Sequence, residues 1–440
     1  AVRRHVVPSS SRSADFSAFP NDEKPDQKWS GFFVPDFGGG RYFNFVKKSK
    51  KEIIFRIASV SHVWQSASAV LKDQNLRKCF PMTPFIIEKT ETPTDPVKRT
   101  ELLANPSFGR VFTDHMAIIR YSADKGWHDA KITPRRPLSI DPASTVLHYG
   151  QEIFEGMKAY REKDGHVATF RPEANAARFA ESARRMGMAE LPEDLFVQAV
   201  DELVRVDQDW VPSGEGQSLY LRPFMISNEV FLGVKPANEY LFIVIACPVG
   251  AYFSSGCVSV WVSENYTRAA IGGTGEAKCG GNYAGSLIAQ AEAKEKGCDQ
   301  VLFLDARERR FVEEMGGMNV MFVRKDGKIV TPPLGGTILR GITRNSLIQL
   351  AADQGIEVIE EPVEIDELFE GAASGKYTEA FACGTAAVLS PIGRFVRPSG
   401  EAVFGDGTTP GPISQKLKKT LTDVQGGRTN DVHGWIHRIS

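Results

Sequence analysis

Length, composition and charge limit the function classes open to this chain. At 440 residues it has room for two or three domains, and its formal net charge of −1 gives no reason to expect nucleic acid or an anionic membrane as a partner. A small-molecule site is therefore the default expectation. The six cysteines contain no C-x-x-C pair, which predicts free thiols in a reducing compartment and neither a disulfide framework nor a metal site. No apolar run approaches the roughly 20 residues that span a bilayer.

The first 81 residues differ from the rest of the chain. They hold 14 Lys and Arg residues against 7 Asp and Glu residues, and they lack a sustained hydrophobic period of 2 or 3.6. We expect a disordered extension, or upstream sequence read through a misassigned start, because the first methionine is Met82. The favoured location is cytoplasmic. An organelle is the alternative if residues 1–81 form a transit segment, although Asp22, Glu23 and Asp26 do not fit the acid-poor pattern of such segments.

Residues 82–248 are predicted to form a compact α+β domain. Val167–Phe170, Ser218–Ile226 and Tyr240–Ala246 have the composition of strands. Residues 173–186 and 192–206 have helical periodicity, the second with a continuous apolar stripe.

A turn-rich segment, residues 249–257, is predicted to link this domain to a second one over residues 258–440. The second domain is expected to contain strands at 258–262, 300–304 and 319–323, and helices at 283–296, 343–353 and 365–373. Helices interrupt the strands irregularly, so a simple doubly wound sheet is not the best fit.

The densest chemical signal is the segment Gly272-Gly-Thr-Gly-Glu-Ala-Lys278-Cys-Gly-Gly-Asn-Tyr283, in which five glycines surround one lysine. Glycine lets backbone and ligand approach closely. A phosphate-loop interpretation fails because Ala277 stands where that motif needs glycine, and a dinucleotide interpretation lacks the preceding strand. An isolated lysine near a helix start is usually a solvated charge. In a tight pocket, however, its amine becomes a nucleophile that can form a Schiff base with an aldehyde cofactor.

From about Met82 onward the chain resembles the branched-chain amino acid aminotransferases. Seven motifs in family order carry the resemblance: Phe112–Met116, His148–Tyr160, Leu219–Pro223, Pro248–Phe253, the Lys278 segment, Glu313–Asn319 and Gly384–Ala386. The resemblance implies the two-domain fold type IV of pyridoxal 5′-phosphate (PLP) enzymes, with a small α+β domain and a larger pseudo-barrel α/β domain. It also implies transfer of the amino group of leucine, isoleucine or valine to 2-oxoglutarate.

The resemblance assigns cofactor-binding residues. Lys278 would bind PLP covalently and then move the proton between the substrate Cα and the cofactor's C4′ carbon. Glu314 would face the pyridine nitrogen, and Tyr283 the O3′ oxygen. The phosphate would be held by Arg171, Thr337, Ile338 and Thr385.

The resemblance also assigns a substrate pocket. Its members are Phe108, Tyr149, Phe154, Tyr220, Arg222, Tyr252 and the backbone amides around Gly317 and Ala386. An aromatic pocket suits an aliphatic side chain, while 2-oxoglutarate needs a donor for its distal carboxylate. Arg222 and Tyr149 are the candidate donors, but a strand arginine between apolar neighbours is as often a structural ion-pair partner.

Three alternatives stay open at this point. A D-amino acid transaminase and an aminodeoxychorismate lyase share the scaffold, and a PLP-binding regulatory protein without catalysis is the rival from another class. The chain lacks the C-x-x-C that mammalian relatives carry after Gly-Thr-Ala, since Ala387-Val-Leu-Ser390 follows instead. The resemblance further implies a homodimer whose active sites depend on both subunits.

Overall fold

A computed structural model describes residues 42–49, 52–58, 84–250 and 256–439. The chain forms two compact units, Ala1–Pro81 and Met82–Ser440. In the first unit, β1 (Tyr42–Ser49) and β2 (Glu52–Ala58) pair in antiparallel fashion. These strands occur within the segment for which the sequence predicted no regular structure. Both are rich in aromatic and β-branched residues, which favour extended backbone.

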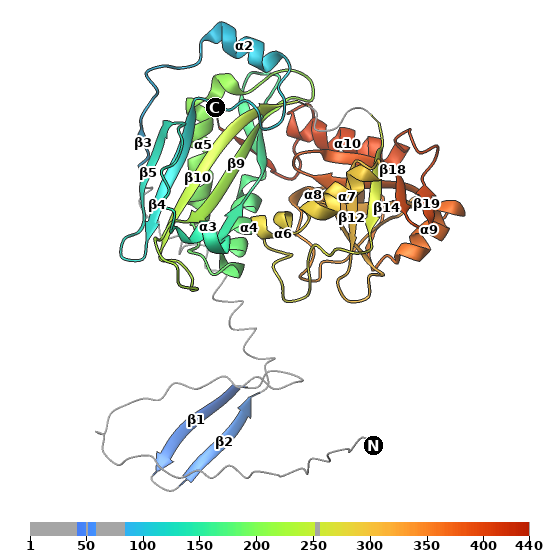
Figure 1. Cartoon of the computed structure of the whole chain (residues 1–440), viewed down its shortest axis with the longest axis horizontal. Coiled ribbons are helices and arrows are strands. Elements are labelled where there is room, and N and C mark those ends of the chain that lie inside the picture. Colours follow the sequence, from blue (N-terminus) through green and yellow to red (C-terminus); the bar gives the residue numbers. More distant parts are fainter. Residues whose placement is uncertain (1–41, 50–51, 59–83, 251–255, 440) are drawn as a thin grey trace, which may run out of the picture. The chain divides into compact units, whose positions relative to one another are not determined.

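A nine-stranded sheet forms the first lobe of the second unit (Figure 1). Its strands are β3 (Ile86–Ile87), β4 (His115–Ser122), β5 (Gly126–Pro134), β6 (Glu152–Phe154), β7 (Met157–Arg161), β8 (Val167–Phe170), β9 (Ser218–Ser227), β10 (Glu239–Val249) and β20 (Ile436–Arg438). Pairing is antiparallel except between β3 and β5. Because β20 pairs with β8, the last described residues return to this lobe, where Figure 1 marks the C-terminus.

Helices cover this sheet and build its core. The helical elements of the lobe are α2 (Pro96–Ala104), α3 (Thr145–Tyr149), α4 (Pro172–Arg185), α5 (Glu193–Val206) and the short 3-10 helix η2 (Gln208–Trp210). The apolar stripe predicted for α5 is buried, as amphipathic periodicity requires. Its Phe196 contacts Phe179 of α4 and Phe242 of β10, with ring centroids 5.3 and 5.7 Å apart, so the two helices and the sheet share one core.

The second lobe is a closed barrel with additional strands. The barrel strands are β11 (Val258–Ser263), β12 (Gln300–Leu304), β13 (Val312–Met315), β14 (Met318–Arg324), β17 (Tyr377–Gly384) and β18 (Val388–Arg397). Pairing between β13 and β14 closes the ring. β15 (Ile329–Thr331), β16 (Val358–Glu360) and β19 (Gly400–Val403) extend it. The α+β lobe and this barrel confirm the predicted fold class.

Five helices complete the second lobe: α6 (Gly280–Ala284), α7 (Leu287–Glu295), α8 (Ile342–Asp353), α9 (Ile365–Ala373) and α10 (Pro412–Gln425). The single helix predicted over 283–296 is wrong, because the chain breaks between α6 and α7. Gly285 favours the break through its low helix propensity, and the Ser286 hydroxyl donates to the Tyr283 carbonyl oxygen at 2.7 Å. Over the described ranges, none of the helices has both the length and the apolar character that crossing a membrane demands.

Candidate functional site

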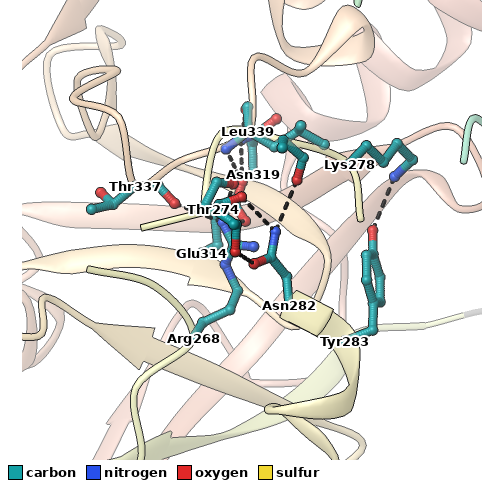
Figure 2. A network of polar contacts seen from close by, with 11 residues as sticks. Arg268, Thr274, Lys278, Asn282, Tyr283, Glu314, Asn319, Thr337 and Leu339 are labelled. Carbon is teal, nitrogen blue, oxygen red and sulfur yellow. Dashed lines mark hydrogen bonds and ion pairs between the residues drawn. The ribbon is translucent and has the colours of Figure 1, made fainter. Parts of the chain in front are cut away.

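The glycine-rich segment around Lys278 is a compact loop held by Asn282. The Asn282 side chain donates to the carbonyl oxygens of Thr274 and Ala277, both at 2.8 Å, and accepts from the Thr274 hydroxyl at 2.7 Å (Figure 2). Gly275 is required for close approach, since a Cβ there would collide with the Thr337 carbonyl oxygen. The sequence drew attention to the glycines but gave no role to Asn282.

Lys278 is fixed by both of its backbone groups and by its amine. Its N–H donates to the Ser182 hydroxyl at 3.0 Å, and its carbonyl oxygen accepts from the Phe154 N–H at 2.9 Å. The Lys278 Nζ donates to the Tyr283 hydroxyl at 2.9 Å and lies 4.8 Å from the centre of the Phe154 ring. Figure 2 shows the amine and the phenol pointing toward each other. The first lobe thus supplies the contacts that orient a lysine of the second lobe.

Glu314 lies at the end of β13 and is 2% exposed. Its Oε2 is 2.5 Å from a guanidinium nitrogen of Arg268, while its Oε1 accepts from the Leu339 N–H at 2.9 Å and from the Asn319 amide at 3.0 Å (Figure 2). Burial raises the pKa of Glu314, and the Arg268 guanidinium opposes that effect. The sequence predicted Glu314 but not Arg268, which stands outside every motif. Asn319 is the last residue of the Glu313–Asn319 motif, but the sequence predicted no function for it.

The first turn of α8 is a second polar feature, and Arg171 reaches it. Arg171 Nη1 donates to Asn345 Oδ1 at 2.8 Å and to Ser346 Oγ at 2.7 Å. The N–H groups of the first helical residues, starting at Ile342, have no partner within the helix, so this end of α8 suits an anion.

Thr337 and Ile338, assigned to the phosphate from sequence, precede α8 and are buried. The Thr337 carbonyl oxygen accepts from Arg268 at 2.7 Å, and the Thr337 side chain bonds to Glu313. The structure therefore places this segment beside Arg268 and Glu314. The backbone N–H groups that would face an anion at the start of α8 belong instead to Ile342 and Thr343. The sequence did not indicate these two residues, because the helix start was predicted one residue late.

Thr385 and Ala386 lie in the turn between β17 and β18. The Ala386 carbonyl oxygen accepts from Lys158 Nζ at 2.8 Å. Lys158 is 6% exposed, and burial lowers its pKa to about 8. Val388, which follows the turn, has φ of 63°, an unfavourable value for a β-branched residue. Lys158 thus holds the turn of Thr385 and Ala386 in place, next to the strained backbone of Val388.

Aromatic side chains surround the amine of Lys278. The Phe154 and Tyr283 ring centroids are 5.0 Å apart, and Phe108 packs edge-on against Tyr220 at 5.0 Å. A Cβ at Gly317 would lie 3.0 Å from the Tyr283 ring, so the β13–β14 turn packs closely beside that phenol.

Arg222 extends over the same aromatic group. Its guanidinium lies 4.7 Å from the centre of the Phe154 ring and donates to the Tyr220 hydroxyl at 3.1 Å. Within the part of the chain that the structure describes, no carboxylate forms an ion pair with Arg222, and its buried Nε has no hydrogen-bond partner. Burial raises the pKa of the nearby Glu152 and the Arg222 charge opposes that effect, but the two side chains form no direct ion pair.

Two predicted pocket residues are not part of this group. Tyr149 is 43% exposed, and its hydroxyl donates to the Leu232 carbonyl oxygen. Tyr252 lies outside the described residues, as does most of the predicted interdomain loop.

The residues present fit a phosphorylated aldehyde cofactor of the PLP type. A lysine amine faces a phenol, a buried carboxylate lies close enough to interact electrostatically with that lysine, and a helix N-terminus with an arginine offers an anion site. An aldehyde needs such a nucleophilic amine, a protonated ring nitrogen needs such an acceptor, and a phosphate needs such hydrogen-bond donors.

Comparisons with known proteins agree with this chemistry. Residues 152–395 match the family model described as amino-transferase class IV. A Streptomyces coelicolor protein named as a probable branched-chain-amino-acid aminotransferase is 55% identical over 362 residues, which cover 81% of this chain and 99% of that protein. The solved branched-chain aminotransferase of Thermoproteus uzoniensis, with norvaline, is 27% identical with a TM-score of 0.63, covering 74% of this chain and all of that one. The Thermobaculum terrenum enzyme in its PLP form is also 27% identical, with a TM-score of 0.60, covering 74% of this chain and 98% of that one.

Proposed function

Because the chain belongs to the branched-chain-amino-acid aminotransferases of amino-transferase class IV, we propose that it transfers the amino group of L-leucine, L-isoleucine or L-valine to 2-oxoglutarate. The products are the branched 2-oxo acid and L-glutamate. The observation that carries the residue assignment is the Lys278 amine, 2.9 Å from the Tyr283 hydroxyl and packed over Phe154. It is the lysine of the glycine-rich segment, and both neighbouring groups orient its Nζ.

PLP, when bound, supplies an electron-accepting ring that stabilises negative charge at the substrate Cα. Lys278 is the residue that holds the cofactor covalently, and its Nζ then serves as the base and acid that moves the Cα proton. Tyr283 keeps that amine in place through its hydroxyl. A base already held within hydrogen-bond reach needs little reorganisation during turnover.

Glu314 is proposed to pair with the cofactor's ring nitrogen. Its carboxylate has about four lone-pair sites, and three contacts from Arg268, Leu339 and Asn319 leave room for another donor. Those contacts also fix the direction in which the carboxylate points. The Arg268 guanidinium favours the ionised form, which is the form that stabilises a protonated ring nitrogen.

The phosphate is proposed to lie at the first turn of α8. Arg171 supplies a cation, the free N–H groups from Ile342 onward supply neutral donors, and Thr385 supplies a hydroxyl. Thr337 and Ile338 remain candidate phosphate-binding residues, because they lie in the loop that leads into this turn.

The substrate is proposed to bind among Phe108, Phe154, Tyr220 and Arg222. The rings accommodate a branched aliphatic side chain, and the Arg222 guanidinium, which keeps an unused donor, binds the distal carboxylate of 2-oxoglutarate. The backbone at Gly317 and Ala386 remains the candidate site for the α-carboxylate.

An absorbance spectrum of the purified protein tests this function directly. We expect a visible band from the bound cofactor that changes on addition of L-leucine and returns on addition of 2-oxoglutarate. D-Alanine and aminodeoxychorismate are added in the same way in place of L-leucine, and the change in the visible band is compared. A response to either of them without a response to L-leucine would assign the chain to the corresponding alternative on this scaffold.

A homodimer is proposed as the working form. Tyr149, a pocket residue by family resemblance, is exposed here and lies among other exposed apolar side chains, including Leu147, Leu232 and Val234, the last 88% exposed. An aromatic pocket residue in an exposed apolar region fits a surface that a second subunit covers. Sedimentation from nanomolar to micromolar protein, with activity measured in parallel, tests this; an active monomer throughout would contradict it.

The proposed location is cytoplasmic. The five cysteines within the described ranges are free thiols, which fits a reducing compartment. Imaging of the full chain carrying a C-terminal fluorescent protein tests the location, and accumulation in an organelle would favour a transit role for residues 1–81.

A further inference from the structure

A buried ion pair lies close to Lys278. Glu155, between β6 and β7, is 0% exposed, and Arg178 of α4 makes two parallel bonds to it, Nε to Oε1 at 2.7 Å and Nη2 to Oε2 at 2.8 Å. The Asn175 amide donates to Oε2 at 2.7 Å, and the Gly156 N–H donates to it at 3.1 Å. Every carboxylate oxygen therefore has a donor.

Such a pair is weak evidence for stability by itself. Removing two charges from water costs free energy that their attraction only partly offsets, and apolar replacements of both partners are often neutral or stabilising. The position of the pair is therefore more informative than its existence.

The pair connects the two segments that fix the Lys278 backbone. Phe154, which precedes Glu155, donates its N–H to the Lys278 carbonyl oxygen at 2.9 Å. Ser182, one turn after Arg178 on α4, accepts from the Lys278 N–H at 3.0 Å. Any shift between β6 and α4 would therefore move Lys278.

The charges of the pair also act on the site. Burial alone would raise the pKa of Glu155, but the Arg178 guanidinium, assisted by the Lys278 ammonium, holds it below its usual range. Tyr283 interacts electrostatically with Arg178. The Glu155 and Arg178 charges therefore lie close enough to interact with Lys278 and Tyr283.

Arg178 makes a further contact that reaches the second lobe. Its Nη1 donates to the Arg340 carbonyl oxygen at 3.1 Å, and Arg340 precedes Gly341, the N-cap of α8. The Arg178 guanidinium therefore contacts Glu155, whose neighbour Phe154 bonds to the Lys278 backbone. It also contacts Arg340, which leads into the first turn of α8.

We propose that the Glu155–Arg178 pair is a positioning element that sets the distance between the Lys278 amine and the first turn of α8. This inference rests on the proposed function, in which those two features hold opposite ends of one cofactor. The cofactor is a rigid ring with a short phosphate arm, so a misplaced anchor weakens either the covalent attachment or the phosphate contacts.

The test compares PLP with pyridoxal, which lacks the phosphate. In the full chain, the double variant Glu155→Leu/Arg178→Met removes both charges and the bond to Arg340. We expect its apoprotein to unfold at a temperature close to that of the wild type. We also expect the ratio of the pyridoxal Kd to the PLP Kd, measured by tryptophan fluorescence, to fall by about tenfold or more.

The matched control is Arg184→Met/Glu190→Leu. Arg184 also lies on α4 and makes two bonds to Glu190, of 3.0 and 2.6 Å, but the two side chains are 63% and 46% exposed. We expect the control to keep the wild-type Kd ratio and the wild-type pH dependence of the visible band.

A folded double variant with an unchanged Kd ratio would overturn the proposal. If that variant does not fold, Arg178→Lys replaces it. Lysine keeps the charge but cannot bond both to Glu155 in parallel and to Arg340, so the Kd ratio should again fall, and an unchanged ratio would again refute the inference. Failure of the proposed function would look different, because the wild type itself would then bind no cofactor at Lys278.

Discussion

Arg268 and Glu314 form a buried ion pair, with 2.5 Å between their charged atoms and side chains that are 5% and 2% exposed. Arg268 also donates to the carbonyl oxygens of Thr337 and Gly275, at 2.7 and 3.2 Å. The arginine therefore joins the carboxylate of β13 to the loop that carries Lys278 and to the segment before α8. Three parts of the proposed cofactor site thus share one structural cation.

Glu314→Gln should lower turnover far more than it weakens PLP binding. The amide keeps the shape and most contacts but cannot stabilise a protonated ring nitrogen, so we expect kcat to fall by about a hundredfold or more. The PLP Kd should rise by less than about tenfold, because Arg171 and α8 still hold the phosphate. Glu313→Gln is the control, since adjacent strand side chains point to opposite faces. Equal losses in kcat and binding would assign Glu314 to structure.

The local motifs predicted much of this site, because the cofactor chemistry concentrates in short segments. Lys278 and Tyr283 lie five residues apart in one glycine-rich segment, and Glu314 is followed by the glycines of a tight turn. Arg268, Ser182 and Lys158 could not be found this way. Their roles depend on contacts between residues distant in sequence: Arg268 and Ser182 lie outside every motif, and the His148–Tyr160 motif that contains Lys158 does not reveal its contact with Ala386.

In the fold, too, local sequence predicts some features, while others depend on contacts between distant segments. Strands such as Val167–Phe170 and Gln300–Leu304 follow from β-branched and aromatic composition, and the sequence predicted their limits. Closure of the barrel depends on the β13–β14 pairing, and the return of β20 to the first lobe depends on its pairing with β8. Neither has a local pattern. The break between α6 and α7 was missed because one glycine and one serine side chain decide it.

Lys278→Ala should abolish transamination and leave a folded protein that binds PLP weakly and without a covalent bond. The amine is the proposed nucleophile that attaches the cofactor, and the methyl group of alanine cannot replace it. Borohydride reduction followed by mass spectrometry measures the covalent linkage. Lys294→Ala, at an exposed position of α7, is the control and should keep both linkage and activity. Reducible cofactor on another lysine of the Lys278→Ala protein would show the assignment to be wrong.

Lys158 should make stability depend on pH in the alkaline range. Burial lowers its pKa from 10.5 to about 8, so between these values the unfolded chain binds a proton that the folded chain does not. The free energy of unfolding therefore rises with pH from about 8 to 10.5. The cost of burying the charged amine is greatest below the folded-state pKa and is lost as the amine gives up its proton.

Lys158→Met removes this effect. From about pH 7 to about pH 9.5 the wild type should gain about 2 kcal/mol in the free energy of unfolding relative to the variant. Urea unfolding at both pH values measures the difference. Lys294→Met is the exposed control and should show no such change. A constant difference between wild type and Lys158→Met would mean that the Lys158 amine keeps an ordinary pKa.

A chain that begins at Met82 should match the full chain in specific activity and melting temperature. Met82–Ser440 forms a compact unit of its own, and every described candidate site residue belongs to it. Its hydrophobic cores are built from residues of that unit. Parallel assays and thermal unfolding of the two chains test this, and a large loss in either would show that the first 81 residues stabilise the enzyme.

Lys278→Ala and Tyr149→Ala should complement each other in mixed dimers. Tyr149 is exposed and bonded to Leu232, so we expect it to complete the pocket of the partner subunit. A hybrid dimer then has one site in which both residues are intact, and random pairing makes about half of the dimers hybrids, so the mixture should recover about a quarter of wild-type activity. The two variants are coexpressed with different affinity tags, and each homodimer alone is the control. Hybrids purified through both tags should be more active than either parent, whereas hybrids no more active than the mean of the parents would show that Tyr149 serves its own subunit or neither.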